Sequence, residues 1–79
     1  SLAILFPPEN AEVLVLEYGE TARGLSLSAR GGREPLTWYA DGERVAREDT
    51  SGRAIWRPDA PGFYDLSVID ADGESAHVR

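Results

Sequence analysis

The sequence is a succession of short apolar runs, each ended by a turn signal, and this spacing limits the fold more than any other feature. The runs return at intervals of about 8–12 residues, which is typical of all-β sandwiches and barrels. Several alternate apolar and polar side chains, as half-buried strands do. No window combines a 3.6-residue apolar period with capping residues, so no helix is expected.

The turn signals define seven or eight strands, and about seven is typical of a small sandwich. Pro7-Pro8 ends the first run and Gly31-Gly32 breaks a later one. Asp41-Gly42 predicts a two-residue type I′ hairpin, because both central residues of that turn need positive φ. Asp72-Gly73 predicts a second hairpin turn. Strands are expected over residues 2–6, 12–17, 24–30, 36–40, 43–46, 54–57, 63–69 and 76–78, with a polar loop over 47–52.

Three features favour a small immunoglobulin-like antiparallel β-sandwich. Trp38 lies on the third main strand, where such folds bury a central tryptophan. Leu27 and Leu66 take the places at which antibody domains carry paired cysteines. Tyr64 stands two residues before Leu66, as in a tyrosine corner, whose hydroxyl bonds to the backbone upstream. The chain has no Cys, so we expect apolar packing around Trp38 to replace the inter-sheet disulfide.

Composition excludes most enzyme mechanisms for this segment. All eight basic residues are Arg, so Ser-x-x-Lys sites, Walker loops and Schiff-base lysines are absent. The single histidine is His77, and without Cys there is no cysteine-type zinc site. A formal net charge of −6 argues against nucleic acid as a partner. No apolar run is long enough to insert into a membrane, and no signal peptide is present.

The 79 residues suffice for one domain, and the missing initiator Met predicts that this domain, residues 1–79, is cut from a longer chain. The charge is uneven: residues 1–20 carry four Glu and no base, whereas residues 21–57 carry seven Arg against five acids. An Arg-rich centre of this kind is either a polar contact face or ordinary solvated surface.

The sequence also resembles the C-terminal domain of the penicillin-binding protein 1C family over nearly its whole length. The most specific stretch runs from residue 56 to residue 73. The matching residues are Ile4-Leu5-Phe6-Pro7, Ala11, Val13, Leu27, Ala29, Gly31-Gly32, Pro35-Leu36-Thr37-Trp38, Asp41-Gly42, Trp56-Arg57-Pro58-Asp59, Pro61-Gly62-Phe63-Tyr64, Leu66, Val68, Asp70 and Gly73. Pro7-Pro8-Glu9-Asn10 departs from the family pattern, which has Asp-Gly or Asn-Gly before Ala11; this alters one turn.

The resemblance implies a bacterial, periplasmic protein, anchored in the inner membrane, whose other domains polymerise and cross-link peptidoglycan. It implies no catalytic residue here, because the transpeptidase motifs Ser-x-x-Lys, Ser-x-Asn and Lys-Thr-Gly do not occur. We therefore expect a non-catalytic accessory domain without cofactor or metal. Its expected partners are the transpeptidase domain of the same chain or another envelope protein, with peptidoglycan ranked below them.

Three groups of residues resemble a metal site or a catalytic site, and each has a simpler interpretation. Asp70 to Glu74 resembles part of a calcium loop, which Glu48 or Asp49 would have to complete, but a hairpin turn explains it better. Ser75 and His77 with Asp70 suggest a hydrolase triad without an oxyanion hole or a cleft. Asp70 and Asp72 as a glycosidase pair would lie in one surface turn without a groove.

One set of residues is a candidate binding surface: Tyr39, Arg53, Trp56 and Arg57. Aromatic residues and Arg are enriched at protein–protein hot spots. Tyr39 should point away from the Trp38 face, whereas Trp56 suits the core better than a ligand platform. Two other functions stay open. A carbohydrate-binding module predicts an exposed coplanar Trp56–Tyr39 pair, and an adhesin stalk repeat predicts sister repeats and stabilisation by calcium.

Overall fold

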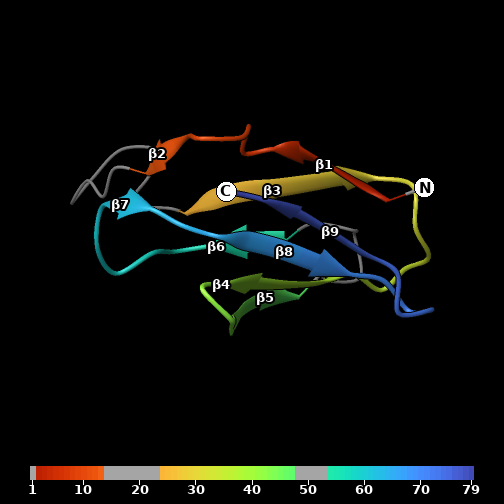
Figure 1. Cartoon of the computed structure of the whole chain (residues 1–79). Coiled ribbons are helices and arrows are strands. Elements are labelled where there is room, and N and C mark those ends of the chain that lie inside the picture. Colours follow the sequence, from red (N-terminus) through yellow and green to blue (C-terminus); the bar gives the residue numbers. More distant parts are fainter. Residues whose placement is uncertain (1, 14–23, 48–53) are drawn as a thin grey trace.

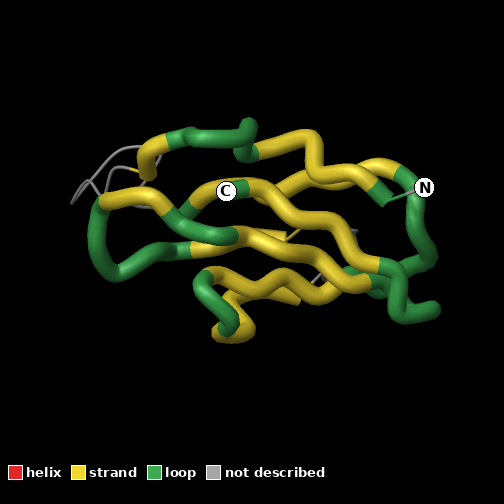
Figure 2. The backbone as a smooth tube through the Cα atoms, viewed as in Figure 1, coloured by secondary structure: helices red, strands yellow, loops and turns green. Residues whose placement is uncertain are grey.

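Strands are the only regular elements of residues 2–13, 24–47 and 54–79, the part of the chain that the computed structural model describes (Figure 2). They are β1 (Ala3–Phe6), β2 (Glu12–Val13), β3 (Leu25–Arg30), β4 (Thr37–Ala40), β5 (Glu43–Arg47), β6 (Ala54–Trp56), β7 (Gly62–Phe63), β8 (Leu66–Ile69) and β9 (Ser75–Val78). The all-β prediction is confirmed.

The strands form two main antiparallel sheets and one short ladder. One sheet has the order β1-β3-β6 and the other β5-β4-β8-β9, while β2 pairs only with β7. Figure 1 shows both sheets running along the long axis of a body measuring 36 × 26 × 19 Å. The two sheets hold the strands expected of an immunoglobulin-like sandwich, so this fold prediction is also confirmed.

The core lies between the two sheets and is centred on Trp38, which is 1% exposed. Leu27 on β3 and Leu66 on β8 are buried in the same apolar cluster, at the positions expected to replace a disulfide. Val68 is fully buried beside them in the cluster. Apolar packing of the two sheets therefore stabilises this cysteine-free fold.

The Asp41-Gly42 turn joins β4 to β5 as predicted. Both residues have positive φ, 52° and 84°, the combination that type I′ requires. The turn is also bound to the start of β8: the Asp41 amide donates to the Asp65 carbonyl at 2.8 Å, and the Asp65 amide donates to the Asp41 carboxylate at 2.9 Å. These two bonds fix one end of the sandwich.

The expected strand over residues 63–69 is wrong as a single element, because it is interrupted at Tyr64 and Asp65. Before the break, β7 pairs with β2; after it, β8 pairs with β4. At the break the Tyr64 hydroxyl donates a hydrogen bond to the Ala60 carbonyl, which is the predicted tyrosine corner. Of the other predicted elements, residues 14–17 and 48–52 lie outside the described residues.

Candidate functional site

The residues of the predicted binding surface point in three different directions. Trp56 on β6 is directed into the core and is 3% exposed, whereas Arg57, the next residue, is exposed. Tyr39 is half-buried on the face of β4 opposite the buried Trp38. Arg53 lies outside the described residues. The structure thus does not bring Tyr39 and Trp56 together, and they form no exposed coplanar pair.

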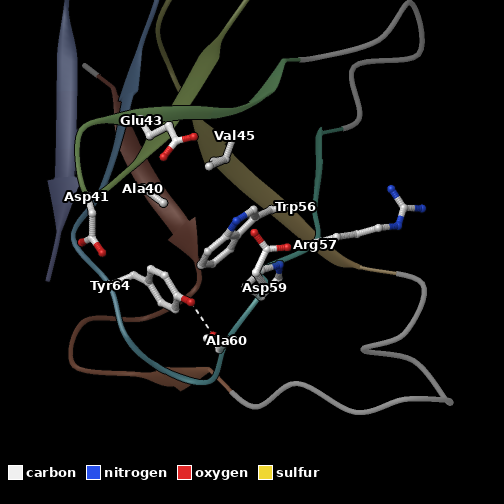
Figure 3. A pocket seen from close by; sticks show the side chains of 10 residues that line it. Ala40, Asp41, Glu43, Val45, Trp56, Arg57, Asp59, Ala60 and Tyr64 are labelled. Carbon is white, nitrogen blue, oxygen red and sulfur yellow. Dashed lines mark hydrogen bonds between the residues drawn. The ribbon is translucent and has the colours of Figure 1, made fainter.

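Trp56 instead packs against Tyr64 at one end of the sandwich. Their ring centroids are 4.8 Å apart and their planes meet at 89°, an edge-to-face contact. The two rings adjoin a cavity of about 260 Å³, which lies between the β4–β5 hairpin and the segment after β6 (Figure 3). The cavity is lined by Ala40, Asp41, Glu43, Val45, Trp56, Arg57, Pro58, Asp59, Ala60 and Tyr64.

Carboxylates are the main charged groups of this cavity. Glu43 and Asp59 approach it from opposite sides, and in Figure 3 the guanidinium group of Arg57 extends away from both. Sequence reasoning missed this cavity because its walls come from separate segments. The available signal was local: Asp41 belongs to the predicted turn, Glu43 follows it, and Asp59 comes directly after Pro58.

A second cluster of polar contacts surrounds Asp70 at the opposite end of the sandwich. Its carboxylate is the only buried charged group among the described residues and accepts three amide hydrogen bonds, from Arg33 at 3.0 Å, Asp72 at 2.9 Å and Glu74 at 2.8 Å. Burial raises the pKa of this carboxyl. The amide donors outweigh burial, so the pKa is lowered from its ordinary value.

These contacts show what the Asp70–Glu74 segment does. The Gly73 amide donates to the Asp70 carbonyl at 3.1 Å and the Asp70 amide to the Glu74 carbonyl at 2.8 Å, so the segment is the predicted hairpin turn between β8 and β9. The bond between Asp70 and Glu74 leaves three residues in the loop, one more than in the Asp41-Gly42 turn, and positive φ occurs there only at Gly73. Because both Asp70 oxygens accept amide hydrogens, this carboxylate serves the fold.

Substitution Asp70→Asn is expected to lower the melting temperature at neutral pH, because the new amide group cannot accept from Arg33 and from the hairpin together. A folded-state pKa below the unfolded value stabilises the fold above about pH 4, and this contribution is lost as the pH falls through the folded pKa. The difference in melting temperature between the unsubstituted chain and Asp70→Asn should therefore become smaller below about pH 4. Thermal melts followed by circular dichroism from neutral to acidic pH would measure it.

Asp72→Asn is the matched control for this experiment. The side chain of Asp72 makes an exposed ion pair with Arg33, at 3.4 Å, and such pairs contribute little, while its backbone amide, which donates to Asp70, is kept in Asp72→Asn. The role given to Asp70 would be contradicted if the loss of melting temperature in Asp70→Asn stayed constant with pH. An equal loss in Asp72→Asn would contradict it as well.

The hydrolase triad considered from the sequence is not assembled in the described part of the chain. Ser75 and His77 are exposed on β9, opposite Ile69 and Ser67, while Asp70 is engaged by backbone amides. Within the described ranges no group of three or more His, Asp or Glu side chains could hold a metal ion. Glu48 and Asp49, which the calcium interpretation needs, lie outside those ranges.

The outer face of the four-stranded sheet is the second candidate surface. Backbone register places Arg44, Tyr39, Ser67 and His77 in one row across it, and Thr37, Ile69 and Ser75 in the next. These rows contain no acidic residue, although the chain as a whole is strongly acidic. Ile69 is 37% exposed and Tyr39 half-buried, so apolar surface lies at the centre of the face.

The fold and these surfaces define a small immunoglobulin-like module in which two rows of one sheet face carry no acidic residue. The match to a family model is complete: the penicillin-binding protein C-terminus family covers residues 1–79. The chain belongs to this family, and so to a protein of the bacterial envelope. Comparisons with curated proteins and with solved structures returned no match. No membrane-spanning helix occurs in residues 2–13, 24–47 or 54–79.

Proposed function

We propose that residues 1–79 are the single, non-catalytic C-terminal domain of a penicillin-binding protein 1C-like peptidoglycan synthase, and that this domain docks on the transpeptidase domain of the same chain. Family membership supports the parent assignment. The domain then faces the periplasm, and its role in cell-wall synthesis is regulatory. Attachment in one chain favours docking, because a tethered partner is present at a high effective concentration.

The observation that carries the proposal is the outer face of the four-stranded sheet. Tyr39 and Ile69 provide apolar contact area, and Arg44 and His77 lie at its edges. Central apolar side chains with a polar rim are the anatomy of protein–protein interfaces. The lack of carboxylates in the two rows removes repulsion from an acidic or neutral partner surface.

The two alternative functions have weaker support. Sugar binding by a flat module needs exposed aromatic faces, but Trp56 is 3% exposed and stands edge-to-face with Tyr64. An adhesin stalk repeat does not agree with membership of the penicillin-binding protein C-terminus family. Another envelope protein and peptidoglycan remain outcomes of the tests below.

Docking predicts that Tyr39→Ala weakens binding of the 79-residue domain to the remainder of its parent synthase by about 30-fold, since truncating a hot-spot aromatic costs about 2 kcal/mol. Isothermal titration calorimetry would measure the affinity. Phe63→Ala is the matched control, because Phe63 is 67% exposed on β7, outside this face. Equal loss for both variants, or none for Tyr39→Ala, would refute this docking face.

Two further measurements separate the alternatives. A parent sequence without a Ser-x-x-Lys transpeptidase motif and a glycosyltransferase domain would overturn the parent assignment. NMR titration of the domain with muropeptides tests glycan contact. Shifts confined to the outer face would replace the protein partner by peptidoglycan, and the absence of shifts at millimolar muropeptide would remove peptidoglycan as a ligand.

A further inference from the structure

We propose that the cavity between the β4–β5 hairpin and residues 57–60 binds the ammonium group of a lysine-type peptide side chain. This site is distinct from the docking face, because its lining includes the buried core residues Ala40 and Trp56 and none of the residues in the two rows of that face (Figure 3). The inference therefore goes beyond the proposed docking function and does not depend on it.

The size of the cavity selects a single side chain. Its volume of about 260 Å³ is below the range of about 300–1,000 Å³ in which drug-sized ligands bind. Ala40, Val45 and Pro58 give it apolar walls. The four-carbon stem of a lysine buries well along such walls while its charged end stays near polar groups. A long amphipathic side chain thus matches the lining better than a compact ion does.

The charge of the cavity selects a cation. Glu43 and Asp59 both line the cavity, and Figure 3 shows them on different sides of it, Glu43 by the β4–β5 hairpin and Asp59 beside Trp56. No ion pair within the described part of the chain engages either of them. Asp41, the third acidic lining residue, instead accepts a hydrogen bond from the Asp65 amide. The carboxylates that border the cavity are therefore not neutralised by a cation of the described chain, which favours a positively charged ligand.

The cationic residue of the lining does not neutralise this pair. Successive residues of a strand point to opposite faces, so the inward direction of Trp56 sends Arg57 outward. A Cβ atom placed on Gly24 would lie 3.0 Å from Arg57 Cγ, which puts the Arg57 stem beside the start of β3. Figure 3 shows its guanidinium group extending away from Glu43 and Asp59.

The aromatic wall adds a second attraction for a cation and is held in place before binding. Trp56 and Tyr64 both line the cavity, but Trp56 is buried, so the half-buried Tyr64 ring is the one that an ammonium group can approach. Tyr64 is fixed by its hydrogen bond to Ala60, and Trp56 by its contact with Tyr64. Such preorganisation lowers the entropy lost on binding.

The test is an NMR titration of the ¹⁵N-labelled chain with the peptide acetyl-Gly-Lys-Gly-amide. We expect millimolar binding, with shifts at the Trp56 indole N–H and at the backbone amides of Glu43 and Asp59. The same peptide with its lysine ε-amine acetylated keeps the stem and loses the charge, so it should bind at least about tenfold more weakly if charge selects the ligand.

Variants of the chain complete the test. Glu43→Gln with Asp59→Asn retains side-chain size, should leave the spectrum of a folded domain, and should weaken binding about tenfold. Glu9→Gln with Glu74→Gln removes the same charge at exposed positions that do not line the cavity and should leave the affinity unchanged. Equal binding of the acetylated peptide, equal loss for both double variants, or no cavity shifts at saturating peptide would overturn the proposal.

Discussion

Trp38→Ala is expected to leave the chain unfolded at room temperature. Trp38 is 1% exposed at the centre of the apolar cluster, and truncating a buried Trp to Ala costs about 3–5 kcal/mol. A single core in a domain this small rarely supplies more than about 3–5 kcal/mol of stability. No disulfide can compensate, because the chain has no Cys. Urea denaturation followed by far-UV circular dichroism would measure the loss.

Trp38→Phe is the informative control. Phe keeps most of the ring volume and removes the Trp38 indole N–H, which is buried and has no hydrogen-bond partner in the structure as described. Removing an unsatisfied buried donor offsets part of the cavity cost. This variant should therefore fold, with a stability between those of the unsubstituted chain and Trp38→Ala. A cooperative melt of Trp38→Ala close to that of the unsubstituted chain would remove Trp38 from its central role.

Gly32→Ala is expected to destabilise the fold by about 2–4 kcal/mol, the sum of a backbone and a packing cost. Gly32 has a φ of +76°, which side chains other than glycine adopt with strain. A Cβ atom there would also lie 2.8 Å from Leu2 Cδ1 and 3.3 Å from both Cβ and Oδ2 of Asp70. Leu2 belongs to the core and Asp70 is held by its amide donors, so neither moves freely.

Gly73→Ala separates the two costs. Gly73 has a similar φ of +88°, but a Cβ atom there would meet no atom within 4 Å. This variant should therefore show only the backbone cost of about 1–2 kcal/mol. The difference between the two variants, measured from urea denaturation midpoints, is the packing cost at Gly32. Equal destabilisation by both would show that Leu2 and Asp70 accommodate the extra methyl group.

The fold could be predicted from the sequence where its signals are local. Alternation of side chains around Trp38 identified a buried face, and Asp41-Gly42 identified its turn through the φ values that only a few residue types accept. The spacing of Tyr64 and Leu66 predicted the tyrosine corner, which is also formed by residues close together in the chain. Each of these features is decided within a few residues along the chain.

The break at Tyr64 and Asp65 could not be read from the sequence, because it depends on strand partners. β7 pairs with β2, whereas β8 pairs with β4. The alternation of side chains continues through residues 63–69, so it does not indicate where the pairing partner changes. The Asp65 amide donates instead to the carboxylate of Asp41, which is 24 positions earlier in the chain. Pairing across such separations appears only in the folded molecule.

The predicted binding surface stays a prediction. It was chosen by residue type, and the structure places Tyr39 on an outer sheet face, Trp56 in the core and Arg57 at an exposed position after β6. Strand alternation alone could have separated Trp56 from Arg57, since neighbours on a strand face opposite sides. The cavity at the end of the sandwich has Glu43 on β5 and Asp59 after β6 in its lining, and two residues so far apart in the chain carry no joint sequence signal.

The contacts of Asp70 also limit how relatives of this chain can vary in length. Loops at the end of a sandwich ordinarily gain and lose residues independently, because each is anchored only by its own strands. Here the Arg33 amide donates to Asp70 from 37 positions away, and the Ala71 amide donates to the Arg33 carbonyl at 2.8 Å. An insertion in either loop breaks bonds made by the other, so the two loops can evolve only as a pair.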